Sequence, residues 1–184
     1  GIELKFLDVG GGLGISYTDS SFPSPSNLIK DLENILGDRT EKIILEPGRS
    51  ISGDAGILLT SVEYVKDNYL IIDAGMNDLI RPALYDAKHQ IINVENNKVP
   101  TKEWTIVGPI CESSDVMAKN YSLGASGGSI LAIKTVGAYG HVMSSNYNSR
   151  RKPPEILVDD NNFEIIRKRE SYEDLIRHEV NLGS

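Results

Sequence analysis

The spacing of apolar residues changes once along the chain, near residue 55. Residues 2–9 are rich in apolar side chains and lead into the glycine-rich residues 10–14. Residues 42–45 form a second such segment, which leads into Glu46-Pro47-Gly48-Arg49. Between these segments, residues 25–37 carry apolar side chains at helical spacing, with a proline at the start and a glycine at the end. This order predicts two largely buried parallel strands connected by a helix.

From residue 56 onward, the apolar residues are mainly branched or aromatic, and they come in short runs separated by Gly, Asn and Pro. Such runs are typical of strands and predict a mostly antiparallel β domain. The predicted strands are residues 57–65, 69–73, 89–94, 104–107, 130–136, 156–158 and 163–166. A short final helix is predicted to begin at Ser171, whose hydroxyl can form a capping box with Asp174. The predicted fold class is therefore α/β followed by β.

The first predicted unit, residues 1–55, is too small to enclose a core. One helix across two strands leaves strand edges and an apolar face uncovered. The chain also begins with Gly1 rather than methionine. We therefore expect this unit to be part of a larger α/β domain, with residues 56–184 forming a second domain.

Composition and charge narrow the range of functions. The 184 residues carry a formal net charge of -7 and the basic run Arg167-Lys168-Arg169 is short, which argues against nucleic-acid binding. No apolar stretch is long enough to cross a membrane. His89 and His141 lack the spacing of metal ligands, so we expect structural roles for them and no metal. The single cysteine cannot form a disulfide within the chain, which favours a reducing compartment, the cytoplasm.

The block Gly108-Pro109-Ile110-Cys111-Glu112-Ser113-Ser114-Asp115 concentrates a thiol, two carboxylates and two hydroxyls after an apolar run. A thiol beside such groups can exchange a proton or attack a substrate. The alternative is a buried cysteine that acts as a small hydrophobic residue. From this block alone the structural role is favoured slightly, so the remaining motifs decide.

Two loops at the ends of predicted parallel strands could bind an anion. The glycine loop presents backbone N–H groups, and Arg49 offers a planar guanidinium to a phosphate or carboxylate. A nucleotide or S-adenosylmethionine site with Glu46 on the ribose is an alternative. That alternative is disfavoured because such a fold would continue with further strand–helix units, whereas this chain turns all-β. Arg81 and Tyr85 could hold a second carboxylate, or form an ordinary surface pair.

Five blocks in this order resemble the fold-type III pyridoxal-phosphate decarboxylases. The blocks are DVGGGLGISY from Asp8, EPGRS from Glu46, DAGMNDLIRPALYDAKH from Asp73, GPICESSD from Gly108 and GAYG from Gly137. The resemblance implies that residues 1–55 are the C-terminal part of a β/α-barrel that binds pyridoxal 5'-phosphate. Residues 56–184 would be the β domain, with a last helix that returns toward the barrel. The family usually forms a homodimer that shares its active site across the interface.

The resemblance also implies roles for individual residues. The cofactor phosphate would be held by the glycine loop and the following strand end: Gly11, Gly12, Glu46, Pro47, Gly48 and Arg49. Arg49, Arg81 and Tyr85 would anchor the non-reacting carboxylate of a small amino-acid substrate, and Glu112 its distal amine. Tyr139 would contact both cofactor and substrate. Cys111 would donate the proton that replaces carbon dioxide.

Within the family, Cys111-Glu112-Ser113 resembles the members that convert meso-2,6-diaminopimelate to L-lysine and carbon dioxide, because ornithine enzymes typically have Asp after the cysteine. The cofactor lysine expected in an early barrel strand does not occur here, and Lys134 lies in a β-domain context. We therefore expect this chain to be catalytically incomplete alone. Two alternatives remain at this point: an inactive binding or dimerisation module, and a sibling decarboxylase acting on ornithine or arginine.

Overall fold

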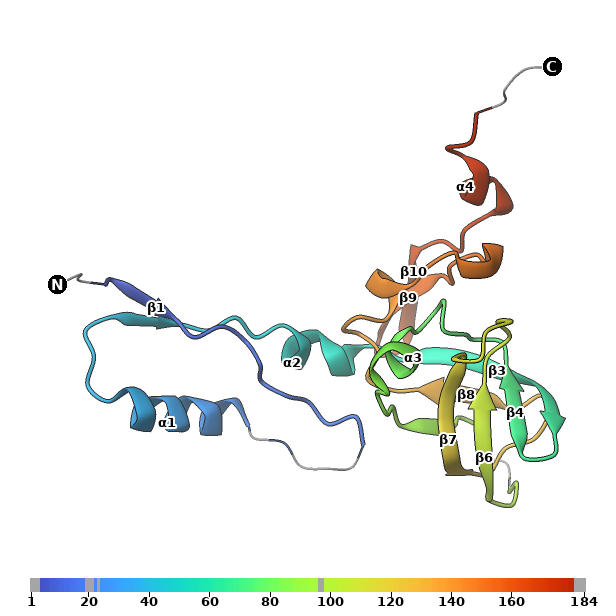
Figure 1. Ribbon diagram of the computed structural model, residues 1–184, viewed down its shortest axis with the longest axis horizontal. Helices are drawn as coiled ribbons and strands as arrows, with labels where there is room; N and C mark the ends of the chain where they lie inside the picture. The colour runs from blue at the N-terminus through green and yellow to red at the C-terminus, as the bar shows by residue number, and fades with distance from the viewer. Residues whose placement is uncertain (1–3, 19–21, 23, 96–97, 181–184) are drawn as a thin grey trace.

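The computed structural model describes residues 4–18, 22, 24–95 and 98–180, and these residues form an elongated arm joined to a β domain (Figure 1). The elements of the arm are β1 (Phe6–Asp8), α1 (Pro25–Leu36), β2 (Lys42–Ile44), α2 (Arg49–Ser52) and a 3-10 turn (Gly53–Ala55). As predicted, β1 and β2 pair in parallel, with Leu7 opposite Ile43. Residues 2 and 3 of the predicted first strand lie outside the described residues.

The local signals in the sequence account for α1. The Ser24 hydroxyl accepts a hydrogen bond from the backbone N–H of Asn27, and proline occupies the first turn. Gly37 ends the helix at φ +64°, a conformation that glycine adopts without strain. The predicted helix is thereby confirmed: it begins at Pro25, as predicted, and Ser24 is its N-cap.

The prediction that the two parallel strands are largely buried is wrong for this chain. Ile43 and Ile44 are 36% and 37% exposed, Phe6 is 57% exposed, and α1 contains no fully buried residue. A single helix covers too little of a two-stranded sheet to exclude water from it. The uncovered faces agree with the expectation that residues 1–55 do not enclose a core.

The β domain is built on a mixed sheet with the strand order β5-β8-β3-β4-β6-β7. Its strands are β3 (Leu58–Lys66), β4 (Tyr69–Ile72), β5 (Ile91–Asn93), β6 (Lys102–Val107), β7 (Val116–Leu123) and β8 (Ile130–Ile133). Among the described residues, β4 and β6 are parallel and the other neighbours in this sheet are antiparallel. The mostly antiparallel domain that the sequence predicted is therefore confirmed.

The sheet curls until its two edge strands approach each other. The Tyr121 hydroxyl of β7 donates to the carbonyl oxygen of Ile91 in β5 at 3.0 Å and accepts from the N–H of the same residue at 2.7 Å. Inside the curled sheet lie the fully buried side chains of Leu70, Ile72, Ile106 and others of the core cluster. The nearly closed sheet forms a rigid base for the loops that emerge from it.

Close backbone packing joins the arm to the β domain. The N–H of Gly137 donates to the carbonyl oxygen of Gly53, and the N–H of Val136 donates to that of Gly56, each at 3.0 Å. A side chain on Gly137 would place its Cβ 2.0 Å from the carbonyl oxygen of Ser52. Only glycine fits here, so this junction sets where α2 lies relative to the sheet.

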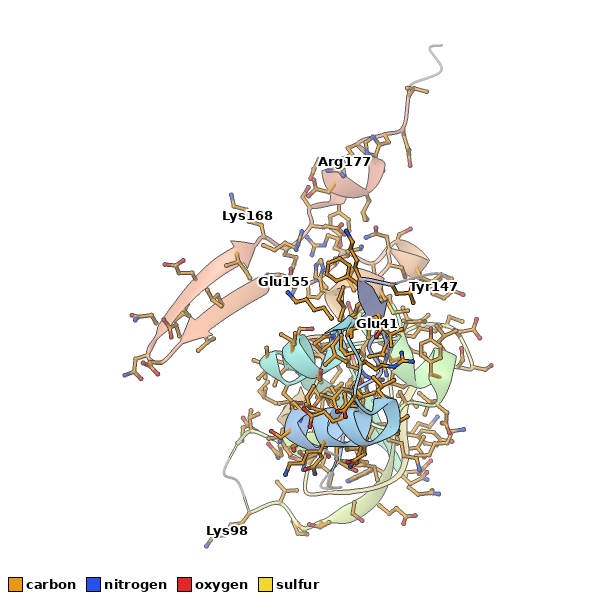
Figure 2. All side chains as sticks on the ribbon, turned by 90° about the vertical axis from the view of Figure 1, so that its left-hand side faces the viewer. Glu41, Lys98, Tyr147, Glu155, Lys168 and Arg177 are labelled. Carbon is orange, nitrogen blue, oxygen red and sulfur yellow. The ribbon has the colours of Figure 1, made fainter. Side chains whose placement is uncertain are left out.

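Of the remaining elements, one lies between β4 and β5 and the others come after β8. They are α3 (Arg81–Tyr85), two 3-10 turns (His141–Met143 and Tyr147–Ser149), the hairpin strands β9 (Glu155–Asp159) and β10 (Asn162–Arg167), and α4 (Tyr172–Ile176). Figure 2 shows the hairpin, between the labelled Glu155 and Lys168, standing away from the rest of the molecule. The predicted capping box at Ser171 and Asp174 is present at the start of α4.

Candidate functional site

The loops after β1 and β2 lie against each other at the carboxyl ends of the two strands. The N–H of Glu46 donates to the carbonyl oxygen of Gly10 at 2.8 Å. A Cβ on Gly11 would come within 2.5 Å of the carbonyl oxygen of Glu46, so the close approach requires glycine. Gly12 adopts φ +92°, which also favours glycine. The structure thus brings together the two loops that the sequence predicted to bind an anion.

Arg81, the first residue of α3, is 8% exposed, and tyrosine rings surround its guanidinium. The guanidinium carbon lies 5.3 Å from the ring centre of Tyr17, 5.7 Å from that of Tyr85 and 5.6 Å from that of Tyr139. Its Nε is buried without a hydrogen-bond partner among the described residues. A buried cation needs an anion or hydrogen-bond acceptors, so this environment suits a negatively charged ligand.

Arg49 belongs to the same group, because its guanidinium carbon lies 5.8 Å from the centre of the Tyr17 ring. Tyr139 reaches the group from the GAYG block in a left-handed conformation, with φ +64°. A Cβ on the following Gly140 would lie 2.4 Å from the carbonyl oxygen of Val136, so the chain turns tightly there. Arg49, Arg81, Tyr85 and Tyr139 were all predicted site residues, and the fold gathers them around one another.

Cys111 and Glu112 lie on a separate exposed loop between β6 and β7. Buried Asp115 anchors this loop by accepting N–H groups from Ile110 at 2.7 Å and from Met76 at 2.6 Å. Burial raises the pKa of Asp115. The structural interpretation of Cys111 as a buried small hydrophobic residue is therefore wrong, since the thiol is exposed.

A segment after the GAYG block packs against this loop. The Tyr147 hydroxyl donates a hydrogen bond to Oε2 of Glu112 at 3.3 Å, and the negative charge of Glu112 raises the pKa of Tyr147. The segment is tied to the β4–α3 connection, because Nη2 of Arg150 donates to the carbonyl oxygen of Asp73 at 2.6 Å. Tyr147 therefore remains protonated and orients the carboxylate of Glu112.

The described residues thus hold two groups: the glycine loops with the arginines and tyrosines, and the loop with Cys111 and Glu112. Between these groups no hydrogen bond, ion pair or ring contact forms within the part of the chain that the structure describes. Sequence analysis missed Tyr17 and Tyr147. Tyr17 ends the glycine-rich block DVGGGLGISY, and that position was the available signal.

His89 packs against Tyr17, next to the group of arginines and tyrosines. It is 3% exposed, its Nδ1 is 2.9 Å from the carbonyl oxygen of Lys134, and its ring packs edge-on against Tyr17. Burial and the positive charge of Arg81 lower the pKa of His89, so its ring is neutral near pH 7. In the described ranges, no three His, Cys, Asp or Glu residues come together as a metal site would require. Likewise, none of the described helices has the length and apolarity to cross a membrane.

Comparison with known proteins agrees with both the sequence blocks and the fold. Residues 16–137 match the family described as pyridoxal-dependent decarboxylase, C-terminal sheet domain. The chain is 46% identical to the diaminopimelate decarboxylase of Neisseria meningitidis serogroup B, over 98% of this chain and 44% of that protein. It is 45% identical to the Aquifex aeolicus protein of the same name, over 99% of this chain and 45% of that one.

A solved structure gives the same picture. The diaminopimelate decarboxylase of Helicobacter pylori, complexed with L-lysine, superposes with a TM-score of 0.89 at 44% identity, over 96% of this chain and 45% of that one. The chain therefore spans less than half the length of these relatives. A family match over residues 16–137, with relatives this similar, establishes that the chain belongs to the pyridoxal-dependent decarboxylases and carries their C-terminal sheet domain.

Proposed function

We propose that the chain is part of an enzyme that converts meso-2,6-diaminopimelate to L-lysine and carbon dioxide with pyridoxal 5'-phosphate. The observation that carries this proposal is the buried side chain of Arg81, whose Nε has no hydrogen-bond partner among the described residues and whose guanidinium is ringed by tyrosines next to two loops suited to an anion. The identities of 45–46% to enzymes named for this substrate support it. Residues 1–55 would then be the end of the cofactor-binding barrel, and residues 56–184 the β domain with α4 returning toward the barrel.

The residues after β1 and β2 fit a phosphate group. The backbone N–H groups of residues 11–14 donate no hydrogen bond to any other described residue, so they are free to bind phosphate oxygens. Gly11, Gly12 and the strand end Glu46-Pro47-Gly48-Arg49 would hold this phosphate. When bound, pyridoxal phosphate supplies the sink for the electron pair left at the α-carbon by departing carbon dioxide.

The substrate would be recognised by charge at its non-reacting end. Arg49 and Arg81 would bind the distal carboxylate, and the Tyr85 hydroxyl would donate to it. Tyr139, 43% exposed, would contact both cofactor and substrate. Glu112, oriented by Tyr147, would accept the distal ammonium group. A site that binds both groups discriminates strongly against substrates that lack either, because its polar groups would be left unpaired.

Cys111 would donate a proton to the α-carbon once the carboxylate has left. Its thiol is exposed on the β6–β7 loop and is therefore accessible to another polypeptide. The separation of this loop from the arginine group supports a homodimer in which Cys111 and Glu112 of one subunit complete the site of the other. A free thiol that must stay reduced also suits a cytoplasmic enzyme.

The test is carbon dioxide release by the full-length polypeptide loaded with pyridoxal phosphate. We expect meso-diaminopimelate to give the highest kcat/KM among meso-diaminopimelate, L-lysine, L-ornithine and L-arginine. A preference for ornithine or arginine would instead identify a sibling decarboxylase. A protein that binds the cofactor but releases no carbon dioxide from any of the four would be an inactive binding module.

The role of Cys111 predicts a specific loss in the same full-length enzyme. Cys111→Ala should lower kcat by at least about a hundredfold, the usual size of a general-acid contribution, and leave the affinity for pyridoxal phosphate nearly unchanged. Ser113→Ala, in the same exposed loop, is the matched control and should retain activity. Equal losses of turnover and cofactor affinity in Cys111→Ala would return the thiol to a structural role.

A further inference from the structure

Tyr17 lies where distant parts of the chain meet, because its ring contacts Arg49, Arg81 and His89. It follows the glycine loop after β1, and the guanidinium carbons of Arg49 in α2 and Arg81 in α3 lie 5.8 and 5.3 Å from its ring centre. The face of an aromatic ring carries a partial negative charge and attracts a guanidinium. One ring is therefore in contact with both arginines that the proposed function assigns to the substrate carboxylate.

Contacts with the β domain fix the position of the Tyr17 ring. The N–H of Gln90 donates to the carbonyl oxygen of Tyr17 at 3.0 Å. The ring also meets the His89 ring edge-on, with 4.8 Å between centroids and 74° between planes. His89 is itself held by the carbonyl oxygen of Lys134. Because backbone and ring are both held, Tyr17 presents a preset surface rather than a mobile side chain.

The two positive charges beside the Tyr17 ring lack a negatively charged partner among the described residues. Neither Arg49 nor Arg81 forms an ion pair with a carboxylate in the described part of the chain. Two guanidiniums near one ring repel each other, and the ring reduces this repulsion without neutralising either charge. His89 is neutral and adds no third positive charge. A carboxylate that binds both guanidiniums would be the missing partner.

We propose that Tyr17 is a positioning residue whose ring holds Arg49 and Arg81 in the orientation that binds the distal carboxylate of the substrate. This role rests on the proposed function. The ring, rather than the hydroxyl, does the positioning, because the contacts to both arginines and to His89 are made by the ring. Tyr17 is thus a specificity residue that acts through the two arginines.

The test compares Tyr17→Leu and Tyr17→Phe with the wild type in the full-length holoenzyme. We expect Tyr17→Leu to raise the KM for meso-diaminopimelate and the Ki of L-lysine by about tenfold each, the effect of losing two ring–guanidinium contacts, with little change in kcat. The Ki of cadaverine, which lacks the carboxylate, should stay unchanged. Tyr17→Phe should behave like the wild type. Tyr64→Leu, at an exposed position of β3, is the matched control.

Folding of each variant is checked by the absorbance of bound pyridoxal phosphate and by tryptophan fluorescence. A parallel rise in the Ki of cadaverine, or loss of cofactor binding, would show a general structural role and overturn the proposal. An unchanged KM in Tyr17→Leu would also overturn the role of Tyr17, but it would leave the proposed function intact. A wild-type holoenzyme that releases no carbon dioxide from meso-diaminopimelate would overturn both.

Discussion

Asp115 is a carboxylate that the fold buries at the end of the largely exposed β6–β7 loop. It is 3% exposed, and its oxygens accept hydrogen bonds from the backbone N–H groups of Ile110 and Met76. Burial raises its pKa, and these amides oppose the effect only in part. The folded protein therefore binds a proton at Asp115 more tightly than the unfolded chain does.

This raised pKa predicts that the contribution of Asp115 to the free energy of unfolding decreases as pH rises. In the unfolded chain Asp115 titrates near its usual value of 3.8. Between that value and the higher folded pKa, the folded state holds more protons, so raising the pH favours unfolding. The contribution is most favourable below pH 3.8 and is lost above the folded pKa. Asp115→Asn should lack this dependence.

The measurement is urea unfolding followed by the fluorescence of Trp104, the only tryptophan, which is buried in β6. Asp115→Asn should be less stable by about 1–3 kcal/mol, because one backbone N–H loses its acceptor. The advantage of the wild type should be larger at about pH 4 than at about pH 7. Burial also raises the pKa of Asp78. Because Asp78 is present in both proteins, its effect cancels in the comparison. A difference that does not change with pH would contradict the assignment to Asp115.

At the scale of elements, the β9–β10 hairpin exposes an apolar face. Ile156 pairs with Ile165 and Val158 with Phe163, and these four side chains are 52–76% exposed. An isolated hairpin is marginally stable in water, and an uncovered apolar face favours association. This chain on its own should therefore self-associate through the hairpin.

Val158→Lys combined with Phe163→Lys should reduce this self-association, because the two charges would have to be desolvated in any hairpin contact. Sedimentation velocity of the 184-residue chain measures the effect. Asn161→Lys combined with Asn162→Lys adds the same charge at the turn of the same hairpin and is the control. If the control reduces association equally, net charge and not the apolar face is responsible.

The elements with strong local signals were predictable from sequence. Apolar spacing together with Pro25 and Gly37 located α1, and Ser171 with Asp174 located α4. The strand β7 was missed because a bulge interrupts the alternation of its side chains. Between the pairs Trp104–Tyr121 and Ile106–Ala118, two residues of β7 lie opposite one residue of β6, and one of the two, Asn120, adopts φ +51°. The helices α2 and α3 were also missed, because four or five residues are too short for a periodic signal.

For the whole molecule, the arm and the β domain differ in how well they are covered. The core strands β3, β4, β6 and β8 contain fully buried residues, whereas α1 and β2 contain none. Local opening is easiest where few apolar contacts are lost. We expect amide hydrogens of α1 and β2 to exchange much faster than those of the core strands.

Hydrogen exchange followed by mass spectrometry of this chain measures that difference. Gly137→Ala is an informative variant, since its Cβ would overlap the carbonyl oxygen of Ser52 at the junction. It should speed exchange in α2 and the adjoining turn while leaving β4 and β6 protected. Equal protection of α1 and β6 in the unchanged chain would contradict the difference in coverage.

The sequence by itself determined the elements with strong local signals and the chemistry of single residues. The glycine loops, Cys111 with Glu112, and the arginines could be identified because backbone freedom and side-chain type belong to each residue separately. It also indicated the family, through blocks kept in a characteristic order.

Only the tertiary structure decided which of these residues meet. It brings the Tyr17 ring into contact with both Arg49 and Arg81, joins Tyr147 to Glu112 by a hydrogen bond, and separates the Cys111 loop from the arginine group. It also leaves exposed the strands that their apolar sequence predicted to be buried. The physical reason is that burial and long-range contact depend on what else packs nearby, and local sequence carries no information about those neighbours.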